Sequence, residues 1–99
     1  MFRVEIHEDA EAELGDLRAY DRIIVIDEIE KQLTHEPAKA TKRKKILEAL
    51  ELPWDQLGPV WQLRVGDFRV FYDVFEREKL VIVRAVRRKL PHWTTEDIL

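Results

Sequence analysis

The sequence predicts an α+β fold in which two helices pack on one face of a β-sheet. Three observations lead to this prediction. Residues 2–6 alternate between apolar and charged, two helical patterns follow between residues 8 and 33, and strand-like runs fill the second half of the chain. The expected order is an N-terminal strand, a helical hairpin and a three-stranded antiparallel meander, in a sheet of about four strands. We expect residues 1–99 to form a single domain, because the chain is long enough for one modest core only.

The N-terminal third is expected to contain the first strand and both helices. Apolar residues occupy every second position of residues 2–6, which is typical of a half-buried strand. Acidic residues then crowd the start of the first helix, from Glu8 onward, where negative charge complements the helix dipole. A second amphipathic pattern runs from about residue 21 to residue 33, and Pro37 follows its end. The two helices form an αα-hairpin.

The stretch of residues 61–74 predicts a β-hairpin with its turn at residues 66–67. Side chains of a strand point to opposite faces in turn, so one face of this hairpin is apolar and the other carries Arg64 and Arg69. We expect the apolar face, which includes Trp61, to pack in the core. The arginine face is then the expected working surface. A last strand is predicted for residues 80–86, and basic residues follow it.

Charge is distributed unevenly along the chain, although the net charge is only −3. Residues 1–36 contain eleven acidic residues against four Lys or Arg, whereas residues 37–99 contain nine against thirteen. The C-terminal part can therefore present a positive face to an anionic partner. Its densest basic run is at residues 42–45. This run is interpreted either as a solvated loop or as an electrostatic contact to an anionic partner.

Composition also excludes several kinds of site. The chain has no cysteine, which rules out disulfides, thiol catalysis and cysteine-ligated metal. Its three histidines form no ligand pattern, so neither a metal nor another cofactor is expected. The longest apolar runs have four residues, far fewer than the ~20 of a membrane span, and the start lacks the basic and apolar regions of a signal peptide. We expect a cytoplasmic protein with no membrane partner.

The order of elements and the tract at residues 61–74 resemble the RelE/ParE-type toxins of bacterial type II toxin–antitoxin systems. The resemblance covers nearly the whole chain. It is most specific in that tract, and the basic loop before the meander and the basic end of the last strand support it. RelE-like members cleave mRNA in the ribosomal A site without a metal, whereas ParE-like members inhibit DNA gyrase. The resemblance therefore implies a cognate antitoxin as one partner, with either mRNA and the ribosome or DNA gyrase as the target.

The resemblance also implies roles for single basic residues. Cleavage of RNA by its own 2′-hydroxyl requires cations around the reacting phosphate, and arginine binds phosphate oxygens through two N–H groups at once. The residues that fall on the family's basic positions, and are expected to be catalytic, are Arg64, Arg69, Arg88 and Lys89. The residues expected to bind RNA or the ribosome are Lys42, Arg43, Lys44, Lys45, Arg87 and Trp93.

Other interpretations of these arginines remain open. The two hairpin arginines could simply lie on the solvated face of a half-exposed sheet, with one of them paired across strands to Asp73. Regular alternation places Arg84 on the same face as Val86 and Arg88. For Arg84, an ion pair with Asp73 or with an acidic group of the antitoxin competes with a catalytic role.

The family's C-terminal tyrosine, which several members use for proton transfer or stacking, has no counterpart after Lys89. Only His92 and Trp93 lie there, and His92 is expected at the surface. The basic residues favour a ribosome-dependent mRNA endonuclease that inhibits translation. The missing tyrosine favours the two alternatives, a gyrase inhibitor without chemistry of its own and an inactive member that only binds antitoxin.

Overall fold

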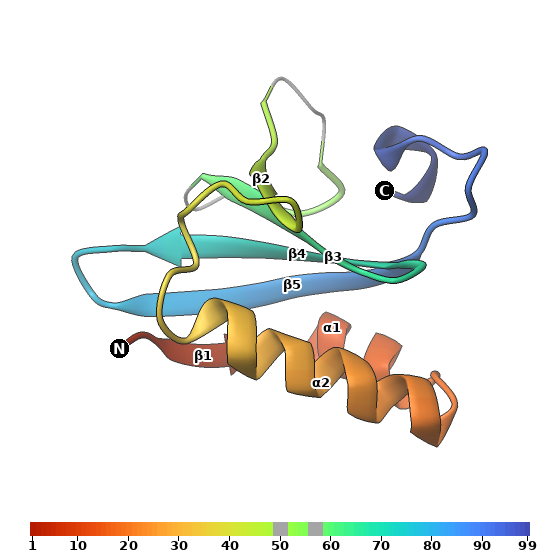
Figure 1. The fold of residues 1–99 in the computed structure, drawn as a ribbon, viewed down its shortest axis with the longest axis horizontal. Coiled ribbons are helices and arrows are strands. Elements are labelled where there is room, and N and C mark those ends of the chain that lie inside the picture. Colours follow the sequence, from red (N-terminus) through yellow and green to blue (C-terminus); the bar gives the residue numbers. More distant parts are fainter. Residues whose placement is uncertain (49–51, 56–58) are drawn as a thin grey trace.

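The chain, analysed as a computed structural model, forms one five-stranded sheet with two helices packed on one of its faces (Figure 1). The structure describes residues 1–48, 52–55 and 59–99. The elements are β1 (Arg3–Ile6), α1 (Glu8–Gly15), α2 (Ala19–Leu33), β2 (Lys44–Ile46), β3 (Val60–Val65), β4 (Phe68–Phe75), β5 (Leu80–Arg88) and a short 3-10 helix, η1 (Thr95–Ile98). The predicted α+β class and the helical hairpin before the meander are confirmed.

The strands follow the order β1-β5-β4-β3-β2 across the sheet. β3, β4 and β5 pair antiparallel and form the predicted meander, whereas β1 pairs parallel to β5. The additional strand, β2, has only three residues and pairs antiparallel with β3. Two of those residues are lysines, so no apolar alternation marked this strand in the sequence. The sequence of residues 46–52 is compatible with one or two helical turns or with an extended stretch, and residues 49–51 of this segment lie outside the described residues.

The main core lies between the helices and one face of the sheet. Its fully buried members include Val25 and Leu33 of α2 and Leu63 and Val70 of the hairpin. Trp61 is buried in the same cluster, as the alternation predicted. A smaller cluster covers part of the opposite face, where Phe71, Ala85 and Ile98 pack together with Trp54. The arginine face of the hairpin is therefore partly covered by the C-terminal segment.

β5 contains a bulge that changes which way its later side chains point. Val83 and Ala85 lie opposite consecutive residues of β4, so Arg84 is an extra residue in β5. One extra residue reverses the alternation of all side chains that follow it. Val86 consequently lies in the main core, while Arg84 lies on the opposite face. The expectation that Arg84 shares a face with Val86 and Arg88 is wrong, because it assumed a regular strand.

The N-terminal helix α1 covers the part of the β5 edge that extends beyond β1. The Glu13 carboxylate accepts a hydrogen bond from the Val86 backbone N–H, 3.0 Å away, and also binds the Arg87 guanidinium. A carboxylate thus takes the place of a neighbouring strand at this edge. None of the helices in the described part of the chain is long and apolar enough to span a membrane.

Candidate functional site

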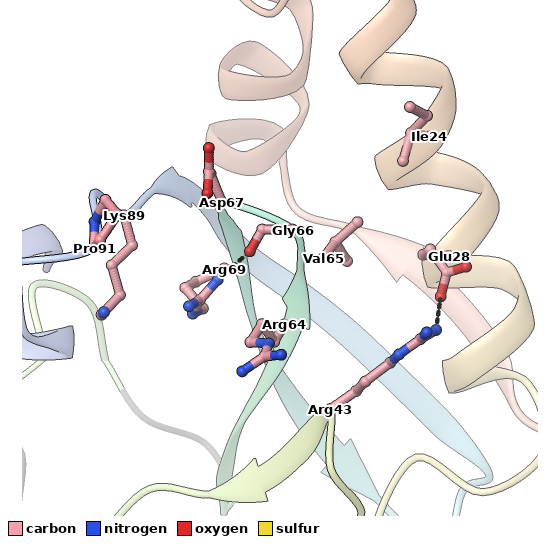
Figure 2. A pocket seen from close by; sticks show the side chains of 10 residues that line it. All are labelled: Ile24, Glu28, Arg43, Arg64, Val65, Gly66, Asp67, Arg69, Lys89 and Pro91. Carbon is pink, nitrogen blue, oxygen red and sulfur yellow. Dashed lines mark hydrogen bonds and ion pairs between the residues drawn. The ribbon is translucent and has the colours of Figure 1, made fainter.

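A cleft with basic walls lies between α2, the β3–β4 turn and the segment after β5 (Figure 2). It has a volume of about 670 Å³. An adjoining hollow of about 200 Å³ shares four basic residues with it, and none of the described residues around this hollow is acidic. We call the two together the cationic cleft. Its lining includes the basic residues Lys42, Arg43, Lys44, Lys45, Arg64, Arg69 and Lys89.

Arg64 and Arg69 lie directly opposite each other on β3 and β4. Arg69 donates hydrogen bonds to the backbone oxygens of Gly66 at 2.8 Å and Phe68 at 2.9 Å, which hold its guanidinium beside the turn. Partial burial and the positive charge of Arg64 lower the pKa of Arg69. Like charges placed opposite each other destabilise a sheet. A bound anion would relieve this repulsion, and the pair is therefore arranged to attract one.

The two basic residues at the end of β5 point to opposite faces of the sheet. Lys89 extends into the cleft on the same side as Arg69 (Figure 2). The Arg88 guanidinium lies over the ring of Phe68, 4.9 Å from its centroid, and 3.6 Å from the Asp21 carboxylate of α2. Phe68 belongs to the main core, so Arg88 lies on the helix side. The structure brings together three of the four expected catalytic residues and separates Arg88 from them.

The basic run at residues 42–45 contains one structural lysine. The Lys44 residue is only 5% exposed, and its Nζ donates hydrogen bonds to the backbone oxygens of Gln32 at 3.1 Å and Glu36 at 2.7 Å. Carbonyl oxygens at a helix C-terminus have no partner within the helix, and a lysine can satisfy them. Burial lowers the pKa of Lys44. The expectation that Lys44 contacts RNA is not supported, because its ammonium group is already engaged beneath the cleft.

The other three basic residues of this run are exposed. Lys42 and Lys45 line the smaller hollow of the cationic cleft. Arg43 extends across the cleft to α2, where its guanidinium lies 3.4 Å from the Glu28 carboxylate (Figure 2). The Arg43 side chain of this ion pair is exposed, so the attraction between Arg43 and Glu28 is weak in water. An anionic ligand could displace Glu28 from Arg43 at little free-energy cost.

Two of the expected RNA-binding residues lie away from the cleft lining. Arg87 lies opposite Arg69 in the β4–β5 pairing, but its side chain is bound to Glu13 of α1 at the edge of β5 and lines neither hollow. Trp93 is exposed, and its ring meets the ring of His92 edge-on with centroids 5.9 Å apart. The segment that carries this pair begins at Pro91, which lines the cleft. Trp93 can therefore contact a ligand that extends beyond the cleft, whereas Arg87 is held by its partner.

The cleft also contains residues that sequence reasoning did not assign. Gln62 is only 5% exposed, and its side-chain oxygen accepts a hydrogen bond of 3.0 Å from the Thr95 hydroxyl. Both residues line the smaller hollow. The alternation of β3 placed Gln62 on the arginine face, but nothing in the sequence indicated that Thr95 would fold back over it. Thr94 caps the start of η1.

The buried acid of the hairpin pairs with Arg84, as one of the open interpretations proposed. Asp73 is fully buried, and its carboxylate lies 3.3 Å from the Arg84 guanidinium. Burial raises the pKa of Asp73, and the charge of Arg84 partly offsets this effect. Arg84 also donates a hydrogen bond to the backbone oxygen of Asp55, and its guanidinium lies over the ring of Trp54. Arg84 thus fastens the 52–55 segment to the sheet, and Asp73 is not a partner for the hairpin arginines.

The lining of the cationic cleft limits its chemistry. Neither a histidine nor a tyrosine is among the described residues around either hollow. In the described ranges 1–48, 52–55 and 59–99, no cluster of three acidic or histidine side chains is placed to hold a metal ion. Apart from the carboxylates of Glu28 and Asp67 in the larger hollow, the polar side chains are cations, hydroxyls and one amide, which suit the binding of phosphate oxygens.

Several solved structures share this fold. The toxin–antitoxin complex RelBE2 of Mycobacterium tuberculosis matches with a TM-score of 0.70 and 19% identity, over 89% of this chain and 91% of that chain. The RelBE complex of E. coli matches with a TM-score of 0.64 and 19% identity, over 93% and 100%. The archaeal RelE–RelB complex of Pyrococcus horikoshii matches with a TM-score of 0.62 and 23% identity, over 91% and 97%. At such identities the likeness establishes the fold alone.

Sequence comparison establishes the family. A search of proteins with curated functions found no match to this chain. A family model described as the ParE toxin of the type II toxin–antitoxin system parDE matches residues 4–90, which include α1, α2 and, apart from Arg3 of β1, the five described strands. The chain therefore belongs to the RelE/ParE family, the toxins of bacterial type II toxin–antitoxin systems.

Proposed function

We propose that this toxin is a ribosome-dependent endoribonuclease that holds an mRNA phosphate in the cationic cleft and so inhibits translation in the cytoplasm. One observation carries the proposal: Arg64, Arg69 and Lys89 line one cleft from three different strand ends. In the described part of the chain none of the three forms an ion pair with an acidic side chain. Clustered cations without acidic partners attract anions, and the RNA backbone carries one negative charge per nucleotide.

The proposed reaction is attack of a ribose 2′-oxygen on the adjacent phosphorus. The 2′-oxygen–phosphorus bond forms, the bond to the 5′-oxygen breaks, and the products are a 2′,3′-cyclic phosphate and a 5′-hydroxyl. Negative charge grows on the phosphate oxygens in the transition state, where Arg64, Arg69 and Lys89 stabilise it. The 2′-hydroxyl loses one proton and the leaving oxygen gains one. Because the described cleft lining offers no imidazole or phenol, catalysis relies on charge stabilisation and on the positioning of mRNA by the ribosome.

Residues around the cleft would extend its contact with RNA. Lys42 and Lys45 lie on the rim of the smaller hollow and would neutralise neighbouring phosphates. Trp93 is exposed beyond Pro91 and would stack on an unpaired base. These contacts are independent of sequence, so codon preference would come from elsewhere in the complex.

A second candidate function is inhibition of DNA gyrase by binding alone. It is favoured by the absence of histidine and tyrosine from the described cleft lining. The same features fit a member that binds antitoxin but has no activity. In both cases the cationic cleft would be an interaction surface and would not be an active site.

Single-turnover cleavage of mRNA on programmed ribosomes tests the proposal. We expect Arg69→Ala to lower the rate by roughly 100-fold or more, because a preorganised donor to the developing charge is lost. The matched control is Arg88→Ala, which removes an arginine on the opposite face and should lower the rate less than about tenfold. We expect the same small effect for His92→Gln, since His92 does not line the cleft. Both arginine variants should melt within about 5 °C of the wild type.

Three outcomes would contradict the proposal in different ways. An equal loss of cleavage rate in Arg69→Ala and Arg88→Ala would show that the position of an arginine in the cleft does not decide activity. A collapse in His92→Gln would identify a proton-transfer group outside the cleft. No cleavage by the wild type, together with inhibited gyrase supercoiling and an SOS response in cells, would establish the second candidate.

A further inference from the structure

The larger hollow of the cleft contains carboxylates, although its other charged groups are cations. Among the described residues that line it, Glu28 and Asp67 are acidic. The Glu28 side chain is only 21% exposed, and its Oε2 accepts hydrogen bonds from Gln32 Nε2 at 3.3 Å and from an Arg43 guanidinium N–H at 3.4 Å. A carboxylate beside a phosphate site repels the RNA backbone. Glu28 therefore weakens RNA binding unless it contacts a part of the RNA that donates hydrogen bonds.

The pair of Arg43 and Glu28 presents a guanidinium N–H donor next to two carboxylate acceptors (Figure 2). Of the four RNA bases, guanine has the complementary Watson–Crick edge, on which the O6 acceptor is followed by the N1–H and N2–H donors. Adenine and cytosine carry a ring-nitrogen acceptor where guanine has N1–H. Uracil carries a carbonyl oxygen where guanine has its amino group. A carboxylate repels these acceptors, so the pair discriminates in favour of guanine.

Apolar side chains flank this pair. Ile24 lies one turn before Glu28 on α2, and Val65 lies at the end of β3; both line the larger hollow (Figure 2). An unstacked base is commonly held against apolar side chains while polar groups bind its Watson–Crick edge. The larger hollow has a volume of about 670 Å³ and shares its basic residues with the smaller one. A base in the larger hollow would therefore lie beside a phosphate bound by the cations.

We propose that Glu28 and Arg43 bind an unstacked guanine next to the scissile phosphate, so that the toxin cleaves mRNA preferentially beside guanine. Glu28 accepts hydrogen bonds from N1–H and N2–H, and Arg43 donates one to O6. Arg64, Arg69 and Lys89 hold the phosphate. The inference deepens the proposed function and rests on it. It assigns a base preference to the toxin itself, whereas the phosphate contacts on the rim of the cleft are independent of sequence.

A purely structural role explains this ion pair less well. The Arg43 side chain is 57% exposed, and exposed ion pairs contribute little to folding. Asp27 and Lys31, which lie 2.9 Å apart, form an ordinary pair between neighbouring turns of α2. The pair of Glu28 and Arg43 instead joins α2 to the segment before β2, across the hollow (Figure 2). It is therefore placed to contact a ligand in the hollow.

The test uses synthetic mRNAs on programmed ribosomes that differ in one base of the A-site codon. The bases are guanine, inosine's hypoxanthine, which lacks the amino group, 2-aminopurine, which lacks O6 and N1–H, and adenine. We expect the wild type to cleave beside guanine roughly tenfold faster than beside adenine, with the two analogues between them. Glu28→Gln should lower the guanine rate to the adenine rate. The matched control is Glu30→Gln, which alters an exposed acid of α2 outside the cleft lining and should keep the preference.

The outcomes separate this inference from the proposed function. Cleavage by the wild type without a base preference would overturn the inference alone, and so would a guanine preference that survives Glu28→Gln. No cleavage by the wild type would refute the proposed function, and binding would then decide the inference. The probes are the trinucleotides UGU and UAU, titrated into the toxin and followed by NMR. Tighter binding of UGU that is lost in Glu28→Gln would support guanine recognition, and equal binding of both would overturn it. Melting of Glu28→Gln within about 5 °C of the wild type excludes unfolding as the cause.

Discussion

Two adjacent lysines of β2 have opposite surroundings. Lys44 is buried and donates to the carbonyl oxygens of Gln32 in the last turn of α2 and of Glu36 just beyond the helix, whereas Lys45 lies exposed on the rim of the cationic cleft. The sequence presents both as members of one basic run. It could not distinguish them, because their roles follow from the face of a strand that the sequence did not predict and from the position of a helix end twelve residues away.

Substitution of these two lysines should separate stability from RNA binding. Lys44→Met keeps the aliphatic stem but leaves the α2 carbonyls without a donor, so it should lower the free energy of unfolding by about 1–3 kcal/mol in urea titrations. RNA affinity should hardly change. Lys45→Ala should leave stability within about 0.5 kcal/mol of the wild type and reduce the salt dependence of RNA binding by about one phosphate contact. The reverse pattern would show that Lys44 is the RNA ligand.

Among the elements, the hairpin was the most predictable and β5 the least. Strict alternation in residues 61–74 fixed the turn, the core face and the positions of Arg64 and Arg69. β5 is equally apolar, but its bulge at Arg84 follows from packing against β4 and leaves no mark in the alternation. The same bulge decides the position of Arg88, because the extra residue at Arg84 reverses the alternation of the β5 side chains that follow it.

The edge of β5 offers a prediction at the scale of elements. Glu13→Ala should remove the acceptor of the Val86 amide and the partner of Arg87 together, and lower the free energy of unfolding by about 1–3 kcal/mol. Amide exchange at Val86 should accelerate more than at its neighbours in the core. Glu11→Ala, which alters an exposed acid on the same helix, is the control and should have little effect. An unchanged exchange rate of the Val86 amide in Glu13→Ala would show that water replaces the Glu13 carboxylate as its hydrogen-bond acceptor without loss of protection.

At the scale of the whole molecule, the uneven charge of the sequence becomes a division in space. The acidic N-terminal third forms β1 and the helices, while the basic residues of the later strands line the cleft. The charge count predicted that the C-terminal part can present a positive face, and the family resemblance singled out Arg64, Arg69 and Lys89, which line the cleft. Neither could predict that Arg87 and Arg88 would be paired with Glu13 and Asp21, because these contacts join segments more than sixty residues apart.

This division predicts how salt affects the antitoxin complex. Part of the attraction is between exposed charges, so affinity should fall as the salt concentration rises, mainly through slower association. Arg64→Gln combined with Arg69→Gln should flatten this dependence, because both residues line the cleft. Arg77→Gln, at the exposed turn at the opposite end of β4, should not. Titration calorimetry over a range of salt concentrations measures the effect, and a salt-independent wild-type affinity would refute it.

The parallel pairing of β1 with β5 has a consequence for synthesis of the toxin. Arg3 lies opposite Leu80, so the first strand to be translated has no neighbour until the last strand is made. Contacts between such distant segments form late in folding, because a long loop must close first. Lys89 follows the same last strand. A nascent chain therefore lacks a closed sheet and a complete set of cleft cations until β5 and Lys89 have been synthesised.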